Sequence, residues 1–295
     1  MTQPDWPGLP AMRRAFDAAA DSYDQAAVLQ REVNQRLLER LELIRLQPEQ
    51  VLDLGAATGD STDALRRRYR KARVTALDLS PRMLQRARRR GSWRRPLRCV
   101  CADTHALPFR DSSMDLVFSS GMLHWCADAP GVFAEAQRVL RPGGLFLFAT
   151  YGPDTLRELR QAWESVDQWD HVNRFTDMHD LGDAMVHAAF ADPVMDMEQF
   201  TITYADVRGL LKDLRALGGG QVFGERRRGL LTPAALERLA QAYGAFAQAD
   251  GRLPASWEVV YGHAWATERL IQHKDDAGAV TVSLDDFRRG VRLRS

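Results

Sequence analysis

Lysine and cysteine are both scarce in this chain of 295 residues. Three of the 40 basic residues are lysines, and the cysteines number three, Cys99, Cys101 and Cys126. These cysteines form neither Cys-x-x-Cys pairs nor combinations with histidine at zinc-site spacing, so we expect neither disulfides nor a metal site. No apolar run reaches the length of a membrane helix, about 18 residues, or of a signal peptide near the N-terminus. We therefore expect a cytoplasmic protein.

A surplus of either charge is also absent. The 40 Lys and Arg residues face 39 Asp and Glu residues, which gives a net charge of +1 at pH 7. This balance provides no general attraction to nucleic acid or to a membrane surface. Arginines are nonetheless concentrated in three clusters, at residues 66–73, 86–90 and 226–228. We regard these clusters as candidate docking surfaces.

Short apolar segments alternate with segments of helical periodicity between residues 51 and 150. The hydrophobic content of 45% is that of a globular protein. We predict strands at 51–55, 74–78, 97–103, 114–120 and 144–150, and helices at about 60–69, from Pro81 and at about 130–140. Such alternation is typical of an α/β fold, in which helices cover both faces of a parallel sheet.

The flanking segments are more helical. Val33, Leu37, Leu41 and Ile44 recur at three- and four-residue spacing and predict two helices within residues 11–46. Beyond residue 150 we predict helices at about 154–167, 177–189, 205–217 and 233–248, and strands at 194–204 and 257–267. These two strands are expected to form the far, antiparallel edge of the sheet, with a helical insertion at about 205–250 that caps the strand ends. The predicted divisions are a helical lid (1–47), a main domain (48–270) and a tail without clear periodicity (271–295).

The segment VLDLGAATGD, residues 51–60, predicts a ligand site. A buried strand leads into a turn with Gly55 and Gly59, and a helix follows at once. Glycines let a backbone approach a ligand closely, and free amides at a helix N-terminus suit an anionic group. The spacing matches neither the G-x-G-x-x-G motif of dinucleotide sites nor a phosphate-binding P-loop. A dinucleotide is therefore disfavoured.

Two further acids end neighbouring strands. Asp78 lies 25 residues after Asp53 at the end of the second strand, where a carboxylate accepts hydrogen bonds from both ribose hydroxyls. Asp103 ends the third strand, where it can accept a hydrogen bond from an adenine amine. Because ligands of open α/β sheets bind at the carboxyl ends of the strands, the three acids together predict an adenosine.

This half of the chain resembles the class I S-adenosylmethionine-dependent methyltransferases, whose glycine loop reads D-x-G-x-G-x-G. Ala57 stands in place of the middle glycine, so we expect weakened but not abolished cofactor binding. The LRPGG motif at 140–144 also matches that family. The resemblance implies a Rossmann-like sheet and S-adenosyl-L-methionine as cofactor. The residues it assigns to cofactor binding are Asp53, Gly55, Ala57, Gly59, Asp78, Leu79, Asp103 and Thr104.

A wider resemblance covers about residues 12–268. The segments FDAAADSYDQAAVLQREV, SSGMLHWCAD, YGPDTLRELRQAW, HVNRF and DMHDLGDAM are similar to those of the malonyl-[acyl-carrier protein] O-methyltransferases of biotin biosynthesis. That family methylates the free carboxylate of a malonyl thioester. The resemblance implies an acidic carrier protein as partner, which would dock on an arginine cluster, and no nucleic acid or membrane partner.

The implied substrate pocket is assigned to seven further residues and Tyr23. A carboxylate is already ionised near pH 7, so the reaction needs positioning and no general base. The planar guanidinium fork favours Arg174 of HVNRF as the carboxylate holder, with Arg157 second. Tyr23 and His124 are expected to position the substrate. The remaining predicted pocket residues are Trp125, Tyr151, His171 and Asn173.

Two other interpretations stay open from the sequence. Similar glycine loops occur in relatives that resemble an arginine hydroxylase and in small-molecule methyltransferases. The second alternative is a non-catalytic module that binds RNA through its arginines and has a cofactor site spoiled by Ala57. Clustered arginines without interleaved aromatics are a weak indication of RNA binding, so we favour the malonyl methyltransferase.

Overall fold

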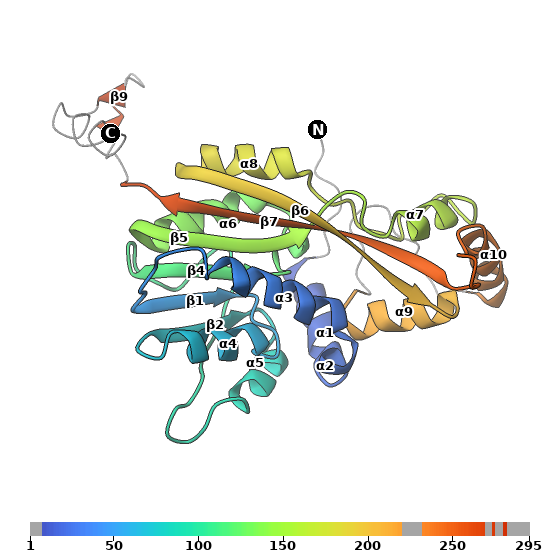
Figure 1. Ribbon diagram of the computed structural model, residues 1–295, viewed down its shortest axis with the longest axis horizontal. Helices are drawn as coiled ribbons and strands as arrows, with labels where there is room; N and C mark the ends of the chain where they lie inside the picture. The colour runs from blue at the N-terminus through green and yellow to red at the C-terminus, as the bar shows by residue number, and fades with distance from the viewer. Residues whose placement is uncertain (1–7, 220–231, 269–272, 275–279, 282–295) are drawn as a thin grey trace.

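The centre of the protein is a twisted sheet with helices on both faces (Figure 1). The computed structural model describes residues 8–219, 232–268, 273–274 and 280–281, and in them the main sheet has seven strands in the order β3-β2-β1-β4-β5-β7-β6. The strands are β1 Gln50–Leu54, β2 Arg73–Asp78, β3 Arg98–Cys101, β4 Met114–Ser120, β5 Leu140–Tyr151, β6 Phe190–Tyr204 and β7 Leu253–Ala266. Strands β1 to β5 pair in parallel, whereas β7 pairs antiparallel with both β5 and β6. The predicted mostly parallel sheet with an antiparallel edge is confirmed.

Helices precede, connect and follow the strands. The first three are α1 Leu9–Ala19, α2 Tyr23–Ala26 and α3 Val28–Arg40. Those of the alternating region are α4 Asp60–Arg68, α5 Pro81–Arg88, the short 3₁₀ helix η1 Leu123–Trp125 and α6 Ala129–Val139. The later ones are α7 Arg157–Glu164, α8 Met178–His187, α9 Val207–Ala216 and α10 Pro233–Gly244. None of the described helices is long and apolar enough to cross a membrane.

Alternate residues of the central strands are buried on opposite faces of the sheet. Val51, Phe118 and Leu147 belong to one core cluster, and their chain neighbours Leu52 and Val117 to the other. Each fully buried Leu, Val or Phe side chain contributes about 1.5–3 kcal/mol of transfer free energy. The continuous apolar runs of these strands are therefore explained by burial on both sides.

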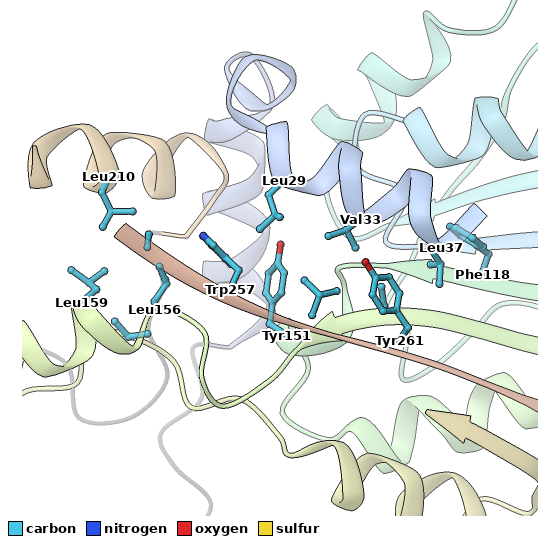
Figure 2. Packing of buried hydrophobic residues seen from close by; sticks show 14 of the residues in the cluster. Leu29, Val33, Leu37, Phe118, Tyr151, Leu156, Leu159, Leu210, Trp257 and Tyr261 are labelled. Atoms are coloured by element: carbon cyan, nitrogen blue, oxygen red, sulfur yellow. The ribbon is translucent and has the colours of Figure 1, made fainter. Parts of the chain in front are cut away.

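Helix α3 covers the first of these faces. Its side chains Leu29, Val33 and Leu37 are buried against the sheet, as Figure 2 shows, and Leu41 just after the helix is also buried. The four-residue spacing places them on one side of the helix. The apolar stripe that the sequence predicts is confirmed at Val33, Leu37 and Leu41, whereas Ile44, its fourth predicted member, lies beyond the helix and is half-buried.

Several element boundaries differ from the sequence-based expectation. The two helices expected in residues 11–46 are three, because Ala27 leaves the helical region with ψ of 48° and separates the single turn α2 from α3. Strand β5 begins at Leu140 and not at residue 144, because Leu140 already pairs with Met114. Strand β6 begins at Phe190 instead of residue 194, with an irregularity after Ala191. In the tail, where no element was predicted, β8 (His273–Lys274) pairs with β9 (Val280–Thr281).

Helices from distant parts of the chain gather at one end of the sheet. Figure 1 shows α1, α2, α9 and α10 at the right of the view, the end to which the arrow of β1 points. Helices α9 and α10 lie between β6 and β7 in sequence, where the helical insertion was predicted, and α10 packs against α7. The proposed domain limits at residues 47 and 270 stay a prediction. The gathering leaves the carboxyl ends of the parallel strands enclosed by helices.

Candidate active site

The turn after β1 is held in a conformation that requires small residues. Gly55 and Gly59 have φ of 71° and 83°, in the left-handed region that favours glycine. A Cβ on Gly55 would lie 2.4 Å from Cβ of Met122, and one on Gly59 would lie 2.8 Å from Cβ of Ala87. Ala57, in the middle of the turn, also has a positive φ, 45°. Glycine is therefore required at positions 55 and 59, because a side chain at either position would clash with a neighbouring residue.

Asp53 supports this turn from beneath. Its side chain is completely buried, and its Oδ2 accepts hydrogen bonds from the hydroxyls of Ser61 and Thr62 at 2.7 and 2.5 Å. These two residues belong to the first turn of α4, so the carboxylate fixes the helix start. Oδ1 has no hydrogen-bond partner among the described residues. Burial raises the pKa of Asp53 to about 6, although the two hydroxyls oppose that shift.

Asp78 reaches the turn from the neighbouring strand. Its Oδ2 accepts the backbone N–H of Ala57 at 2.9 Å and its Oδ1 that of Ser80 at 2.8 Å. Burial raises the pKa of this carboxyl also to about 6. Since a carboxylate has about four acceptor positions, acceptor capacity stays available for a ligand hydroxyl. Asp78 can therefore accept from a ribose while it holds the turn.

A large cavity lies over these strand ends. It has about 1340 Å³ of empty space including its open mouth, which exceeds the ~300–1,000 Å³ of a typical single-ligand pocket. Residues of α1, α2, α3, α9 and the strand ends line it. The predicted cofactor residues on its wall are Gly55, Ala57, Asp78, Leu79, Asp103 and Thr104. Asp53 and Gly59 are not on the wall and act from behind it.

The donor and acceptor set at this end of the cavity fits an adenosyl group. Asp78 has free acceptor positions for ribose hydroxyls, and Asp103 on the next strand lines the same wall. Oδ1 of Asp103 accepts the backbone N–H of His105 at 3.0 Å, which orients the carboxylate. Apolar Leu79 and Ala102 lie beside these acids and offer a surface for a base. The cofactor residues inferred from the sequence are thus brought together, while their contacts with a cofactor stay a prediction.

The other end of the cavity is aromatic. Six of the predicted substrate residues line it: Tyr23, His124, Trp125, Tyr151, His171 and Asn173. The ring of His124 lies 4.3 Å from that of Tyr151, centroid to centroid, and 5.0 Å from that of Trp125. His171 stacks on Trp163 at 3.6 Å and its Nε2 lies 2.8 Å from Oδ1 of Asp167. This end is built from residues of α2, of η1 after the fourth strand, of the end of β5 and of the loop after α7.

Three titratable side chains of this aromatic end, those of Tyr23, His124 and Tyr151, are uncharged at neutral pH. Burial lowers the pKa of His124 to about 3, so its ring is neutral, and raises the pKa of Tyr23 and Tyr151, so their hydroxyls keep their protons. The Nδ1 atom of His124 is buried without a hydrogen-bond partner among the described residues. A general base at this position is therefore disfavoured, in agreement with the sequence-based interpretation of His124 as a pocket wall.

The two candidate arginines are placed differently. Arg174 and Arg157 are exposed, and neither lines the cavity, although Asn173 and Phe175 on either side of Arg174 do. The guanidinium of Arg157 lies 3.8 Å from Asp154 and 3.5 Å from Glu158. Among the described residues that line the cavity there is no arginine or lysine. Carboxylate binding by Arg174 or Arg157 stays a prediction that this placement does not favour.

Residues that the sequence did not single out complete the wall. Gln30 of α3, Trp257 of β7, Phe16 of α1 and Leu214 of α9 all line the cavity. Each lies within a correctly predicted element, but neither periodicity nor a motif distinguishes it from its neighbours. Their common position follows from the packing of four elements that are distant in sequence.

The N-terminal helices are fastened to the cofactor end by polar contacts. The Ser80 hydroxyl donates to Asp17 at 2.5 Å and that of Thr58 donates to Asp24 at 2.5 Å. Arg86 pairs with Asp21, and Arg90 lies 3.3 Å from Asp24. The arginine cluster at 86–90 therefore holds the N-terminal helices in part, and is not a wholly free surface.

Comparison with known proteins identifies the family. A family model described as a methyltransferase domain matches residues 52–148. The chain is similar to a malonyl-[acyl-carrier protein] O-methyltransferase of Halorhodospira halophila, with 54% identity over 94% of this chain and 95% of that protein. A protein of the same name from Gallionella capsiferriformans is 49% identical over 92% of this chain and 96% of its own length.

Solved structures show the same fold. The YcgJ protein of Bacillus subtilis aligns with a TM-score of 0.57 at 16% identity, over 79% of this chain and 98% of that one. A structure described as a putative methyltransferase of Bacillus halodurans aligns with a TM-score of 0.56 at 18% identity, over 78% and 98%. These likenesses concern the fold, while the sequence identities over nearly the full length concern the family. The chain belongs to the malonyl-[acyl-carrier protein] O-methyltransferase family.

Proposed function

We propose that this protein transfers the methyl group of S-adenosyl-L-methionine to the free carboxylate of malonyl-[acyl-carrier protein]. The neutral ester formed in this way primes pimeloyl synthesis for biotin. The observation that carries the proposal is one continuous cavity with the acids that we assign to adenosyl binding at one end and an aromatic wall at the other. Full-length similarity to proteins of that name supports the choice of substrate over the arginine hydroxylase and small-molecule alternatives.

The chemistry requires little acid or base from the protein. Bound S-adenosylmethionine supplies an electrophilic methyl group on a sulfonium. A carboxylate oxygen forms the new C–O bond, the C–S electron pair stays on sulfur, and no proton is transferred. Burial lowers the pKa of His124 to about 3 and makes its ring a weak base. This agrees with a reaction in which no proton has to be accepted. The protein contributes alignment of the reacting atoms and exclusion of water, for which well-oriented intramolecular reactions indicate about 7–11 kcal/mol.

At the cofactor end, Asp78 would accept from the ribose hydroxyls and Asp103 from the adenine amine. The Ala57 N–H is already bound to Asp78 at 2.9 Å, so this amide holds the turn and is not a free donor for the ligand. Tyr23 of α2 lines the aromatic end of the cavity. Closure of α1 and α2 over the cavity would keep water from the sulfonium.

One of the three arginine clusters would form the docking surface for the carrier protein. The cluster at 66–73 spans the end of α4 and the start of β2. It therefore lies at the amino ends of the parallel strands, whereas the cavity lies at their carboxyl ends. The cluster at 86–90 is partly bound to lid acids. The cluster at 226–228 lies outside the described residues. We therefore assign docking to Arg226, Arg227 and Arg228.

Mass spectrometry of malonyl-carrier protein tests the reaction directly. After incubation with the enzyme and S-adenosylmethionine, the acyl group is expected to gain the mass of one methylene. Acetyl-carrier protein, which has no free carboxylate, serves as the control and is expected to stay unchanged. An unmodified malonyl group at saturating cofactor would contradict the proposal.

A further inference from the structure

Three polar atoms on the cavity wall have no partner in the described part of the protein. They are Oε1 of Gln30, Nδ1 of His124 and Nε1 of Trp257, and all three are buried. Most buried polar atoms in proteins are hydrogen-bonded, so a group of exceptions on one wall calls for a ligand that completes them. Trp257 is the clearest case, because an indole N–H can only donate and its side chain is 95% buried.

Trp257 and Tyr151 lie side by side on one face of the sheet. Tyr151 pairs with Val259 across β5 and β7, and Trp257 is two residues from Val259, so both rings project from the same face. Their ring centroids are 5.0 Å apart. Figure 2 shows the Tyr151 oxygen directed toward Leu29 of α3 and the Trp257 nitrogen above the same face of the sheet. Two polar atoms are thus presented together.

The Tyr151 hydroxyl is prepared as a donor. Nε2 of Gln30 donates to the Tyr151 oxygen at 3.2 Å, so the hydroxyl accepts one bond and its own hydrogen is available. Burial raises the pKa of Tyr151, which keeps that hydrogen in place. With the indole N–H of Trp257, the wall therefore offers two uncharged donors, which matches the two oxygens of a carboxylate.

We propose that the malonyl carboxylate is held by the indole N–H of Trp257 and the hydroxyl of Tyr151 and not by a guanidinium. This assignment rests on the proposed function. It agrees with the lack of arginine and lysine among the described residues of the wall. Gln30 orients the Tyr151 hydroxyl through the hydrogen bond already present.

The charge balance of the reaction favours uncharged donors. A positive sulfonium and a negative carboxylate become a neutral thioether and a neutral ester, so charge is lost on the way to the transition state. A guanidinium would stabilise the reactant carboxylate more than the half-neutralised transition state, and such binding does not accelerate the step. Neutral N–H and O–H donors orient the oxygens with less of this penalty. An acyl group without a carboxylate would leave both donors unpaired, which selects against it.

Steady-state kinetics of Trp257→Phe and Tyr151→Phe test the assignment. Each change removes one donor and keeps an aromatic ring. With malonyl-carrier protein, kcat/KM is expected to fall at least tenfold in each variant. The calorimetric Kd for S-adenosylhomocysteine is expected to stay within twofold, and the thermal unfolding midpoint close to that of the wild type. A merely structural role would lower the midpoint and the cofactor affinity together.

Two control variants separate the alternatives. Tyr261 also carries a buried hydroxyl without a partner, on the same face of β7, but it does not line the cavity. Tyr261→Phe is therefore expected to leave kcat/KM within twofold, and so is Arg174→Ala. A tenfold loss of kcat/KM in Arg174→Ala, with kcat/KM of Trp257→Phe and Tyr151→Phe near that of the wild type, would overturn the assignment. Arg174 would then be the residue that binds the carboxylate.

Failure of the proposed function is distinguishable from failure of this assignment. If the wild type forms no methyl ester, the function is wrong. The assignment is then decided by binding of malonyl- and acetyl-carrier protein to enzyme saturated with S-adenosylhomocysteine. Tighter binding of the malonyl form, lost in Trp257→Phe, supports it, and equal binding of the two forms by the wild type refutes it.

Discussion

Asp53, which is buried, and Asp78, which is half-buried, are two carboxyls with the same pKa shift and different surroundings. Each pKa is raised to about 6 by burial. Asp53 is bound to Ser61 and Thr62 and lies behind the wall, whereas Asp78 lines the cavity. Only protonation of Asp78 therefore removes an acceptor that faces a ligand.

Affinity for S-adenosylhomocysteine should depend on pH through Asp78. The pKa lies above the usual value of 3.8, so the carboxylate is mostly ionised at pH 8 and becomes protonated as the pH falls through about 6. We expect calorimetric affinity to be flat above pH 7 and to decline below 6. Asp78→Asn should lower affinity at pH 8 at least tenfold and flatten this dependence. Asp53→Asn is the control and should keep it; a wild-type affinity constant from pH 5 to 8 would contradict the prediction.

At the scale of elements, the turn from β1 to α4 depends on backbone freedom and on close packing. Gly59 precedes α4 in a left-handed conformation and faces Ala87 of α5. Gly143, within β5, has a similar φ of 75° but has no atom within 4 Å of an added Cβ. Comparing alanine variants at these two positions therefore distinguishes the cost of a left-handed backbone from the cost of a steric clash.

Gly59→Ala and Gly143→Ala should differ in a predictable way. A left-handed alanine costs about 1–2 kcal/mol, which applies to both variants. In Gly59→Ala the new methyl group also lies 2.8 Å from Cβ of Ala87, so α4 or α5 must shift. We expect a larger loss of unfolding free energy in denaturant titration, together with weaker S-adenosylhomocysteine binding. Equal losses in the two variants would show that packing against α5 is unimportant.

At the scale of the whole molecule, the cavity is assembled from both ends of the chain. The lid helices, the strand ends, the loop after α7 and the end of α9 each supply part of the wall. Under the proposed function, a thioester on a carrier protein would reach the cavity past these helices. The arginines at 66–73 are at the opposite edge of the sheet, so their position does not suit docking.

Charge reversal should distinguish the arginine clusters. Changing Arg226, Arg227 and Arg228 to Glu is expected to raise the KM for malonyl-carrier protein at least fivefold at low salt and to leave S-adenosylmethionine affinity unchanged. Because the Debye length falls as salt rises, the effect should diminish at high ionic strength. The matched control is reversal of the exposed residues Arg70 and Arg73, which should leave KM unchanged. A raised KM in the control alone would place docking at the other edge.

The alternating elements and the glycine turn were predictable from the sequence because their causes are local. Strand and helix periodicities repeat within a few residues, and the carboxyl ends of parallel strands meet at one edge of a sheet. Asp78 and Asp103 follow from that rule, although 25 residues separate them. The same local rules could not place the boundary of β5 at Leu140, which depends on its pairing with Met114.

The sequence alone determined the α/β class, the glycine turn at the strand ends and the resemblance that named the family. The pairing of Trp257 with Tyr151, their contact with Gln30 of α3, and the exposure of Arg174 were decided by tertiary structure. The pairing of Trp257 with Tyr151 depends on the antiparallel register of two strands. The contact with Gln30 depends on the rotation of α3 over the sheet. The third depends on the direction of one side chain in a loop. None of these is specified by the spacing of residues along the chain, because each results from packing between segments that are far apart in sequence.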